Sequence, residues 1–240
     1  MMEVKNIAKS FGKAKVLKGI DLAVEQGKTL AVLGKSGCGK TTLLKIISGL
    51  ESKDTGNVIL DNNDVEDWPT HKRSAVYMYQ EPLLFPHMSV FENIAFGLKS
   101  KTPQPSDWKD QTNEMIVQLG LKEHTNKYPA QLSGGQKQRV NFGRAIIIKP
   151  SVLLLDEPFG NLDTETRKQM QQLFKTLTHK YAITSLFVTH DLKEALLMGD
   201  DVALMDDGVL YFYNDEKEFL ADPRTGGQTE LSFWQKFFHE

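Results

Sequence analysis

The sequence has a single cysteine, no long apolar run and no excess of either charge. Cys38 is the one cysteine in 240 residues. No disulfide can therefore form within the chain, which favours a reducing compartment. The 29 Lys and Arg residues nearly balance the 31 Asp and Glu residues, leaving a net charge of −2. This balance argues against nucleic-acid binding through a broad basic face, and we expect no nucleic-acid partner.

Membrane insertion and export are disfavoured because the sequence also lacks the apolar segments that they require. A membrane-spanning helix needs about 18 or more consecutive apolar residues, and the longest runs here, such as Val152–Leu155, are far shorter. The N-terminus, MMEVKNIAKS, has no apolar signal core. We therefore expect a chain that neither crosses a membrane nor is exported, so any membrane role must come through a partner.

The pattern of apolar residues predicts an α/β fold around a mostly parallel sheet. Hydrophobic residues make up 40% of the chain and charged residues 25%, which is ordinary for a globular protein. Short runs rich in Val, Ile and Leu predict strands over Met2–Ala8, Val16–Val24, Thr29–Leu33, Val58–Asp61, Ala75–Gln80, Val152–Asp156 and Ser185–Thr189, and a hairpin over Val202–Tyr213. Helical spacing predicts helices over Thr41–Leu50, Thr164–Lys180 and Asp191–Met198.

Helical periodicity also dominates residues 89–148, which we interpret as a helical lobe inserted between strands. The segment SKTPQPSD, residues 100–107, interrupts it and is predicted to be an exposed loop because it contains two prolines. The C-terminal TELSFWQKFFHE is predicted to be an amphipathic helix with Leu231, Trp234 and Phe238 along one side. We expect this helix to pack on its own domain, with a partner site as the alternative.

A glycine-rich segment, GKSGCGKT at Gly34–Thr41, matches the phosphate-binding pattern G-x-x-x-x-G-K-[ST]. A predicted strand precedes it and a predicted helix follows, which is the context this motif requires. Glycines let backbone N–H groups converge on phosphate oxygens, and the helix adds its positive N-terminal end. We expect Lys40 to reach the β- and γ-phosphates of a nucleotide and the Thr41 hydroxyl to bind Mg²⁺.

Two adjacent carboxylates end the apolar run SVLLLDE. Asp156 and Glu157 lie at the predicted end of a buried strand, where like charge and desolvation both oppose ionisation. Next to a phosphate loop, we expect Asp156 to bind Mg²⁺, directly or through water, and Glu157 to polarise the attacking water. The alternative is a solvated pair at the edge of a loop. Guanine is disfavoured as the base, because Asn126-Lys127 is followed by Tyr128-Pro129 and not by the aspartate of a guanine-binding motif.

The stretch QLSGGQKQRVNFGRA, at Gln131–Ala145, suggests a family. Leu132–Gln136 spells LSGGQ and lies shortly upstream of SVLLLDEP. With these motifs, the chain resembles the ATPase subunits of ATP-binding cassette (ABC) transporters over nearly its whole length. Ser133 is suited to cap a helix whose two glycines leave its start open to anions. The alternative for this segment alone is an ordinary capped helix.

The resemblance implies a P-loop NTPase core with a mostly parallel sheet, an N-terminal antiparallel β subdomain and an inserted α-helical subdomain. The core would comprise residues 1–88 and 149–240, and the helical lobe 89–148. The resemblance implies that the catalytic residues are Lys40, Gln80, Glu157 and His190. It implies that the ligands of Mg²⁺ are Thr41, Gln80 and Asp156. The residues that it implies bind ATP within one chain are Phe11, Gly34, Lys35, Ser36, Gly37, Cys38, Gly39, Lys40, Thr41 and Thr42. Those that it implies contact the ATP bound by the other copy of a dimer are Ser133, Gly134, Gly135, Gln136 and Asp163.

Three positions depart from the family pattern. Lys35 stands where many relatives have proline, and Phe11 replaces the commoner tyrosine expected to stack on adenine. Gly143, in the segment Asn141–Gly143 of the signature helix, costs about 1 kcal/mol relative to alanine in a helix interior. This helix is therefore expected to be either softer than usual or closely packed.

The partners implied by the resemblance are a second copy or a paralogous ATPase, a transmembrane permease subunit and a solute-binding protein. The segment Gln80–Leu98 resembles the part of importer ATPases that receives the permease. Its apolar cluster, Leu84, Phe85, Pro86 and Met88, is expected to be partly exposed for docking, with burial in the lobe as the alternative. This arrangement would place the chain in the cytoplasm, peripheral on the inner face of the cell membrane.

The nearest subgroup by resemblance is the importer ATPases for sugars, polyamines, iron or sulfate. Many of these carry a regulatory barrel after the cassette, whereas this sequence ends at Glu240, so we expect a chain without that domain. Two alternatives stay open: an ABC ATPase for export or lipid extraction, and a soluble mechanical ABC ATPase. The transported substrate is expected to be chosen by the partners.

Overall fold

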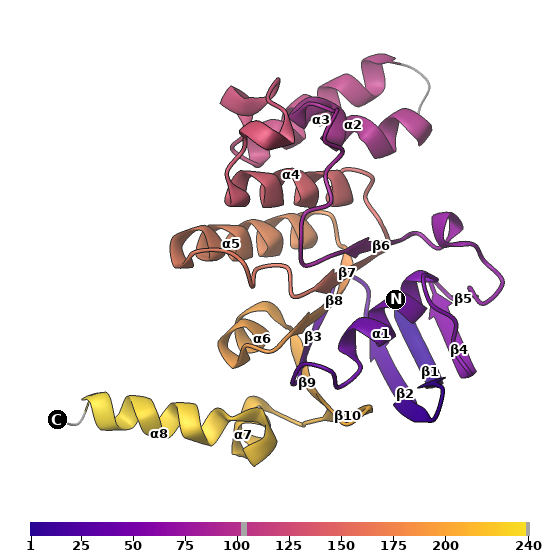
Figure 1. The fold of residues 1–240 in the computed structure, drawn as a ribbon, viewed down its shortest axis with the longest axis vertical. Helices are drawn as coiled ribbons and strands as arrows, with labels where there is room; N and C mark the ends of the chain where they lie inside the picture. Colours follow the sequence, from indigo (N-terminus) through magenta and orange to yellow (C-terminus); the bar gives the residue numbers. More distant parts are fainter. Residues whose placement is uncertain (102–104, 239–240) are drawn as a thin grey trace.

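Two β-sheets and a set of flanking helices make up the fold (Figure 1). The computed structural model describes residues 1–101 and 105–238, with side chains for all of these except residues 100, 101, 105–107, 231 and 234–238. In this part of the chain, one sheet has six strands in the order β10-β9-β3-β8-β7-β6, and the other has four in the order β2-β1-β4-β5.

The six-stranded sheet forms the centre of the molecule. Its strands are β3 (Thr29–Leu33), β6 (Ala75–Met78), β7 (Val152–Asp156), β8 (Thr184–Thr189), β9 (Asp201–Asp206) and β10 (Val209–Phe212). All neighbouring pairs are parallel except β9 and β10, which form the predicted hairpin. The prediction of an α/β fold with a mostly parallel sheet is therefore confirmed.

The four-stranded sheet is antiparallel and comes from the N-terminal part of the chain. It contains β1 (Met2–Phe11), β2 (Ala14–Val24), β4 (Thr55–Leu60) and β5 (Asn63–Asp64). The prediction ended β1 at Ala8, which is three residues short. Cross-strand pairing with β2 continues as far as Phe11 opposite Ala14, and this pairing carries β1 to the turn.

The α-helices are α1 (Lys40–Ser48), α2 (Val90–Lys101), α3 (Pro105–Gln118), α4 (Gly134–Ile146), α5 (Thr164–Lys180), α6 (Leu192–Met198), α7 (Glu216–Ala221) and α8 (Gly227–Phe238). Short 3-10 turns lie at Thr70–Lys72, Lys122–His124, Pro129–Gln131 and Pro223–Thr225. Helix α1 ends two residues before the predicted Leu50 because Gly49 caps it, with its N–H on the Ile46 carbonyl.

The predicted exposed loop over residues 100–107 is largely wrong. Helix α2 continues to Lys101, and α3 already begins at Pro105. Residues 102–104 lie outside the described residues. Proline is tolerated in the first turn of a helix, because the N–H that it lacks would have no partner there, so Pro105 starts a helix and does not prevent one.

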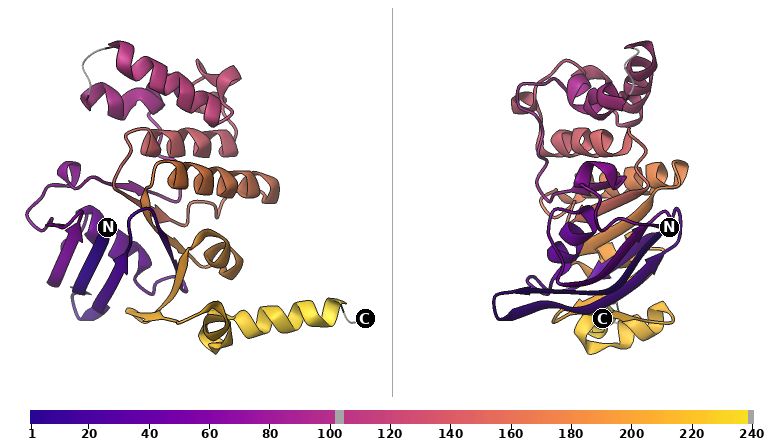
Figure 2. Two further views of the ribbon diagram at one scale, coloured as in Figure 1. Left: turned by 180° about the vertical axis from the view of Figure 1, so that it is seen from behind. Right: turned by 90° about the vertical axis from the view of Figure 1, so that its right-hand side faces the viewer.

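Apolar side chains cover both faces of the central sheet. On β3, Leu30 and Val32 pack toward α1 and the antiparallel sheet, whereas Ala31 and Leu33 pack toward the cluster that includes α5 and α6. Figure 2 shows these layers from behind and from the side. Burial on both faces explains why β3 lacks the alternating polar residues of a half-exposed strand.

Helices α2, α3 and α4 lie between β6 and β7 in the sequence and stack at one end of the molecule (Figure 1). A Cβ atom on Gly143 of α4 would fall 2.3 Å from Cδ1 of Leu119 and 3.5 Å from Cδ1 of Ile94. Of the two expectations for Gly143, the structure supports close packing: the glycine lets α4 approach its neighbours.

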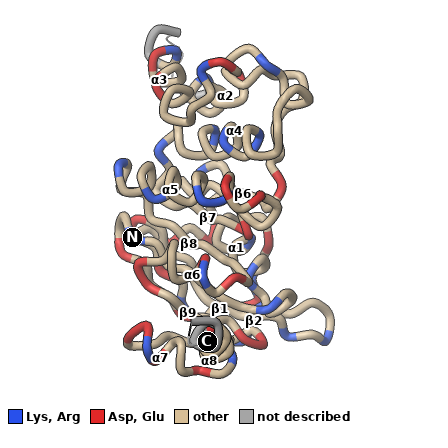
Figure 3. Tube along the Cα trace, turned by 90° about the vertical axis from the view of Figure 1, so that its left-hand side faces the viewer, with Lys and Arg blue, Asp and Glu red and all other residues tan. Residues whose placement is uncertain are grey.

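Helix α8 projects from the opposite end of the molecule in Figures 1 and 2. Lys193 of α6 forms an ion pair with Glu230 at its base, at 2.7 Å. The side chains of Leu231, Trp234 and Phe238, expected to share one side of this helix, lie outside the described residues. Charged residues of both signs are scattered along the chain trace in Figure 3. Within the described ranges, none of the helices combines the length and the apolar character needed to span a membrane.

Gly56 offers a test of the antiparallel sheet. It has φ of 95°, and an added Cβ would lie 2.4 Å from the carbonyl oxygens of Lys5 and Asn6. Strain and backbone overlap should together lower the free energy of unfolding of Gly56→Ala by about 3 kcal/mol. The control is Gly12→Ala, at φ of 59° with open space around the new methyl group, which should lose only about 1 kcal/mol. Equal midpoints of the two variants in urea unfolding would contradict this account.

Candidate functional site

The glycine-rich segment forms a loop between β3 and α1. Gly39, at the N-terminus of α1, has a backbone φ of 113°, which residues other than glycine rarely adopt. Within the described residues, no side chain caps this end of the helix. The backbone N–H groups of the first turn are therefore directed outward without a side-chain partner, which is the arrangement that binds anions at helix N-termini.

Lys40 starts α1 with its side chain folded back into the loop. Its Nζ donates to the carbonyl oxygens of Gly34 at 2.6 Å and Lys35 at 3.0 Å, and lies 4.0 Å from Oε1 of Glu157. Lys40 is only 5% exposed. A buried ammonium needs such partners, because an unpaired charge in the interior is strongly unfavourable.

Asp156, at the end of β7, receives hydrogen bonds from two hydroxyl groups. Thr41 Oγ1 donates at 3.1 Å and 2.9 Å to the two carboxylate oxygens, and Tyr77 Oη donates to Oδ2 at 2.6 Å. Sequence reasoning missed Tyr77. A hydroxyl and a carboxylate meeting at the mouth of a phosphate loop are the oxygen ligands that Mg²⁺ prefers, so this donor set fits the cation.

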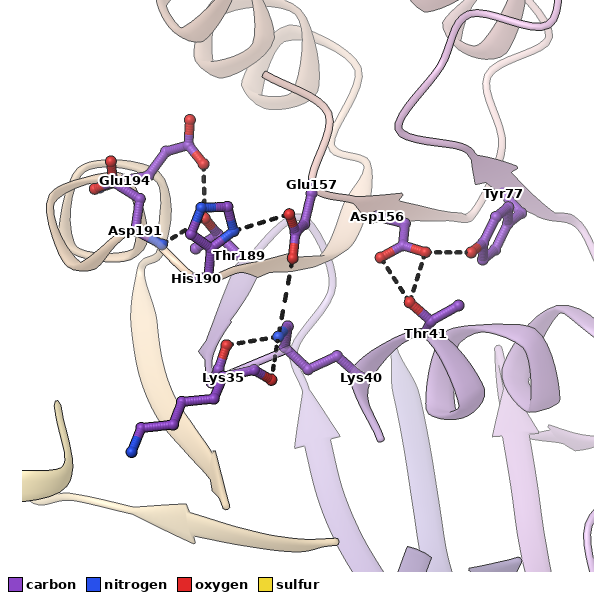
Figure 4. A network of polar contacts seen from close by, with 11 residues as sticks. Lys35, Lys40, Thr41, Tyr77, Asp156, Glu157, Thr189, His190, Asp191 and Glu194 are labelled. Atoms are coloured by element: carbon purple, nitrogen blue, oxygen red, sulfur yellow. Dashed lines mark hydrogen bonds and ion pairs between the residues drawn. The ribbon is translucent and has the colours of Figure 1, made fainter. Parts of the chain in front are cut away.

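Glu157 and His190 form a direct contact beside this pair (Figure 4). His190 Nδ1 lies 2.8 Å from Oε2 of Glu157, with the histidine side chain 57% and the glutamate 18% exposed. Glu157 has φ of 46°, unusual for a residue other than glycine, and its N–H is held by the Val188 carbonyl at 3.0 Å. Backbone strain of this kind concentrates at functional sites.

The chain around His190 is fixed by a buried network that the sequence did not reveal. The Thr189 hydroxyl donates to Oε2 of Glu194 at 2.8 Å and accepts from the Asp191 N–H at 3.0 Å. Gln171 of α5 donates to the other oxygen of Glu194 at 3.2 Å. Burial raises the pKa of the Glu194 carboxyl, opposed by these hydrogen bonds. The network joins β8, α5 and α6 directly behind His190.

One pocket brings together many of the predicted residues, including the metal and catalytic residues other than His190. It has a volume of about 420 Å³ and is lined by Val16, Ser36, Gly37, Gly39, Lys40, Thr41, Thr42, Gln80, Asp156 and Glu157. A neighbouring pocket of about 350 Å³ includes Gly34, Lys35 and His190. A larger pocket of about 650 Å³ lies at the other, amino-terminal ends of β3 and β9, away from the loop and the paired carboxylates.

The remaining predicted residues lie apart from this pocket. Ser133 caps α4 and accepts from the Gln136 N–H at 3.3 Å, while its own N–H donates to Oε1 of Gln136 at 3.0 Å. Asp163 caps α5 through the Thr166 N–H, and these hydrogen bonds lower its pKa. Gly134 is exposed and Gly135 is half-buried. None of these residues lines the phosphate-loop pocket among the described residues.

Phe11 is likewise outside the pocket, at the end of β1. Its ring is 49% exposed, and the ammonium of Lys9 lies 4.9 Å from the ring centroid. One face of the ring is thus engaged in a cation–π contact. The exposed ring is suited to stacking on a planar group.

Cys38 yields a prediction about the loop. Its thiol is half-buried, and burial raises its pKa above the ordinary value, only partly opposed by the Lys40 charge. Because the thiolate is the reactive form, the folded chain should be alkylated by iodoacetamide at pH 8 more slowly than the same chain in urea, by about tenfold for each unit of pKa increase. Mass spectrometry of timed samples measures both rates, and equal rates would contradict a protected thiol.

Comparisons with known proteins place these features in a family. Residues 17–160 match the sequence profile described as ABC transporter. The chain is 44% identical over 213 residues to the sulfate/thiosulfate import ATP-binding protein CysA of Pectobacterium atrosepticum, covering 87% of this chain and 64% of that protein. It is 41% identical over 223 residues to the spermidine/putrescine import ATP-binding protein PotA of Aggregatibacter actinomycetemcomitans, covering 93% and 60%.

A solved structure agrees with the sequence comparisons. It is the dimeric structure of a post-hydrolysis state of the ATP-binding cassette MJ0796 bound to ADP and Pi, with a TM-score of 0.77 and 29% identity, covering 88% of this chain and 96% of that chain. The chain spans less than two thirds of the length of the two curated relatives. The matched profile covers more than half of the sequence and includes both the phosphate loop and the paired carboxylates, and the chain therefore belongs to the ABC transporter family.

Proposed function

We propose that this chain is the ATP-hydrolysing subunit of an ABC transporter and drives solute import through a separate transmembrane subunit. The observation that carries the proposal is the pocket in which Lys40, Asp156 and Glu157 surround a glycine-rich loop at the start of a helix. The two curated relatives, both described as import ATP-binding proteins, support the direction of transport.

The loop is the proposed site for the phosphates of ATP. Its residues are Gly34, Lys35, Ser36, Gly37, Cys38, Gly39, Lys40, Thr41 and Thr42. The Lys40 ammonium, now held by two loop carbonyls, would donate to the β- and γ-phosphates, and Phe11 would stack on adenine. Thr41, Asp156 and Gln80 would hold Mg²⁺, which when bound neutralises charge on the phosphate oxygens.

Glu157 is the proposed general base. Its carboxylate lies at the edge of the pocket, where it can accept a proton from water attacking the γ-phosphate. His190, at 2.8 Å from this carboxylate, would orient the carboxylate and position the attacking water. The Thr189–Glu194 network holds the segment that carries His190 in place. Lys40 stabilises the negative charge that develops on the transferring group.

A second copy is the proposed source of the residues that lie outside the pocket. Ser133, Gly134, Gly135 and Gln136 form a partly exposed helix start with features of an anion site, and Asp163 lies on a neighbouring loop. A head-to-tail C2 dimer would place them opposite the phosphates bound by the facing chain. The dimeric state of the MJ0796 cassette, which binds ADP and Pi, supports this arrangement.

A partly apolar surface after Gln80 is the proposed docking site for the permease. Leu83 is 55% and Phe96 45% exposed, and the rings of Phe85 and Phe96 are in contact at 4.6 Å. Arg144 of α4 donates to the Leu83 carbonyl at 2.6 Å and lies over the Phe85 ring at 5.0 Å. The surface is therefore tied to the helix that carries the LSGGQ sequence, which suits a part that transmits movement.

These assignments imply a division of labour within the chain. Residues 1–88 and 149–240 would form the nucleotide-binding core, and residues 89–148 the helical lobe with the LSGGQ sequence. A permease and a solute-binding protein would complete the transporter, with this chain peripheral on the cytoplasmic face of the membrane.

Glu157→Gln tests the proposed chemistry. The amide keeps the shape of the side chain but cannot accept the proton, so kcat should fall by about 100-fold or more while ATP binding persists. Glu114→Gln, an exposed acid on α3, serves as the matched control and should keep wild-type turnover. Phosphate release measures turnover, and gel filtration with ATP measures whether the variant accumulates as a dimer. Turnover at the wild-type rate in Glu157→Gln would refute the role.

Leu83→Glu tests the docking surface. A charge in an apolar interface is desolvated without a partner and should weaken association with the permease by about tenfold or more. Val117→Glu, at a 61% exposed position on α3, is the control for adding a charge at another exposed apolar position. Co-sedimentation with native membranes measures association, and nucleotide titration verifies that ATP binding is intact. Equal membrane recovery of the two variants would exclude this surface as the contact.

A further inference from the structure

Tyr77 makes the shortest of the hydrogen bonds to the Asp156 carboxylate. Its hydroxyl donates to Oδ2 at 2.6 Å, whereas the bonds from Thr41 measure 2.9 Å and 3.1 Å. Figure 4 shows the two hydroxyls approaching the carboxylate from different elements, β6 and α1. A short bond from a hydroxyl to a carboxylate is charge-assisted and stronger than a bond between neutral groups.

The sheet fixes where this hydroxyl can be. Strands β6 and β7 are parallel, with Tyr77 opposite Leu154. Because side chains alternate along a strand, Leu154 and Asp156 share the face of the sheet that α1 covers, and Tyr77 packs in the same apolar cluster as Leu154. The ring of Tyr79 meets that of Tyr77 edge-on, with centroids 4.5 Å apart. The half-buried ring is thus held on two sides with its hydroxyl at the carboxylate.

Tyr77 and Thr41 differ in what they can do when a cation arrives. Thr41 is a proposed ligand of Mg²⁺, so its present bond to Asp156 would be exchanged for the metal. Tyr77 is not among the proposed ligands, and its hydroxyl donates to Oδ2 of Asp156 from a separate element, β6. Its bond to the carboxylate therefore need not be broken when the cation binds.

Resting on the proposed ATP site, we propose that Tyr77 positions the Asp156 carboxylate for the divalent cation through its hydroxyl. It restricts rotation of the carboxylate and leaves the second oxygen directed at the mouth of the phosphate loop. Tyr77 acts through Asp156 and is a positioning residue, not a ligand. Hydrogen-bond partners behind a metal ligand commonly contribute 10- to 100-fold to metal affinity.

Tyr77→Phe isolates the hydroxyl, because the phenylalanine ring retains the packing against Tyr79. Tyr79→Phe is the matched control: it removes a hydroxyl from the neighbouring ring, for which no bond to Asp156 is present in the described structure. Asp156→Asn and the double variant Tyr77→Phe with Asp156→Asn complete a cycle. The cycle separates an effect through Asp156 from a general effect on the fold, and thermal unfolding of each variant verifies that it is folded.

Two binding measurements on the full chain test the proposal. The first is the affinity for ATP in EDTA, and the second is the affinity of the ATP-bound chain for Mn²⁺, followed by the electron paramagnetic resonance signal of the free ion. Tyr77→Phe should bind Mn²⁺ about tenfold more weakly while its affinity for ATP in EDTA stays the same. Tyr79→Phe should match the wild type in both. In the Asp156→Asn background, removing the Tyr77 hydroxyl should cause no further loss.

The outcomes separate this proposal from the function on which it rests. Wild-type affinity for Mn²⁺ in Tyr77→Phe, or an equal loss in the Asp156→Asn background, would overturn the role of Tyr77 and leave the ATP site intact. A wild-type chain that binds ATP no better with Mn²⁺ than with EDTA would overturn the proposed cation site, and the role of Tyr77 with it.

Discussion

Parallel pairing of β3, β8 and β7 is the constraint on which the site depends. Strands that run in one direction end at one edge of the sheet, so the residues that follow them are brought together although they are far apart in sequence. The glycine-rich loop follows β3, Glu157 follows β7 and His190 follows β8. Backbone hydrogen bonds continue past the strand ends, from the Gly34 N–H to the Thr189 carbonyl and from the Glu157 N–H to the Val188 carbonyl. The loops therefore share the rigidity of the sheet.

Charge compensation determines how the charged side chains at that edge of the sheet are oriented. Lys40 is almost fully buried, and it is stabilised by two carbonyl groups and by the nearby Glu157 carboxylate. Glu157 is in turn held by His190, while its neighbour Asp156 faces the other way, toward two hydroxyl groups. Adjacent carboxylates would repel if they shared one environment. Here the strained backbone at Glu157 directs the two side chains to different partners.

Much of the fold was predictable from local patterns. The apolar runs gave β3 and β7 at their observed bounds, and helix α5 begins and ends at the predicted residues. The phosphate loop and paired carboxylates were recognisable because their chemistry demands particular residues at fixed spacing. The predictions were wrong where a local rule met a competing one: proline was taken as a break, but at Pro105 it occupies a position where helices accept it.

What the sequence could not reveal depends on contacts between distant segments. The partner of Tyr77 follows from the register of β6 on β7, and spacing along the chain carries no information about that register. The Glu194 network similarly joins three elements, so Glu194 in the sequence resembles any acid in the first turn of a helix. The sequence left open whether Gly143 makes α4 softer or allows close packing, and only the position of Leu119 shows that a side chain is excluded there.

The self-contained bonding of Lys40 has a consequence for the energetics of ligand binding. Because the Lys40 ammonium bridges two carbonyls of its own loop, these bonds restrict the conformation of the loop. The conformational entropy of closing the loop is lost during folding and not during association. A phosphate bound by such a preorganised loop therefore loses less of its interaction energy to ordering the loop, and more of that energy remains available as affinity.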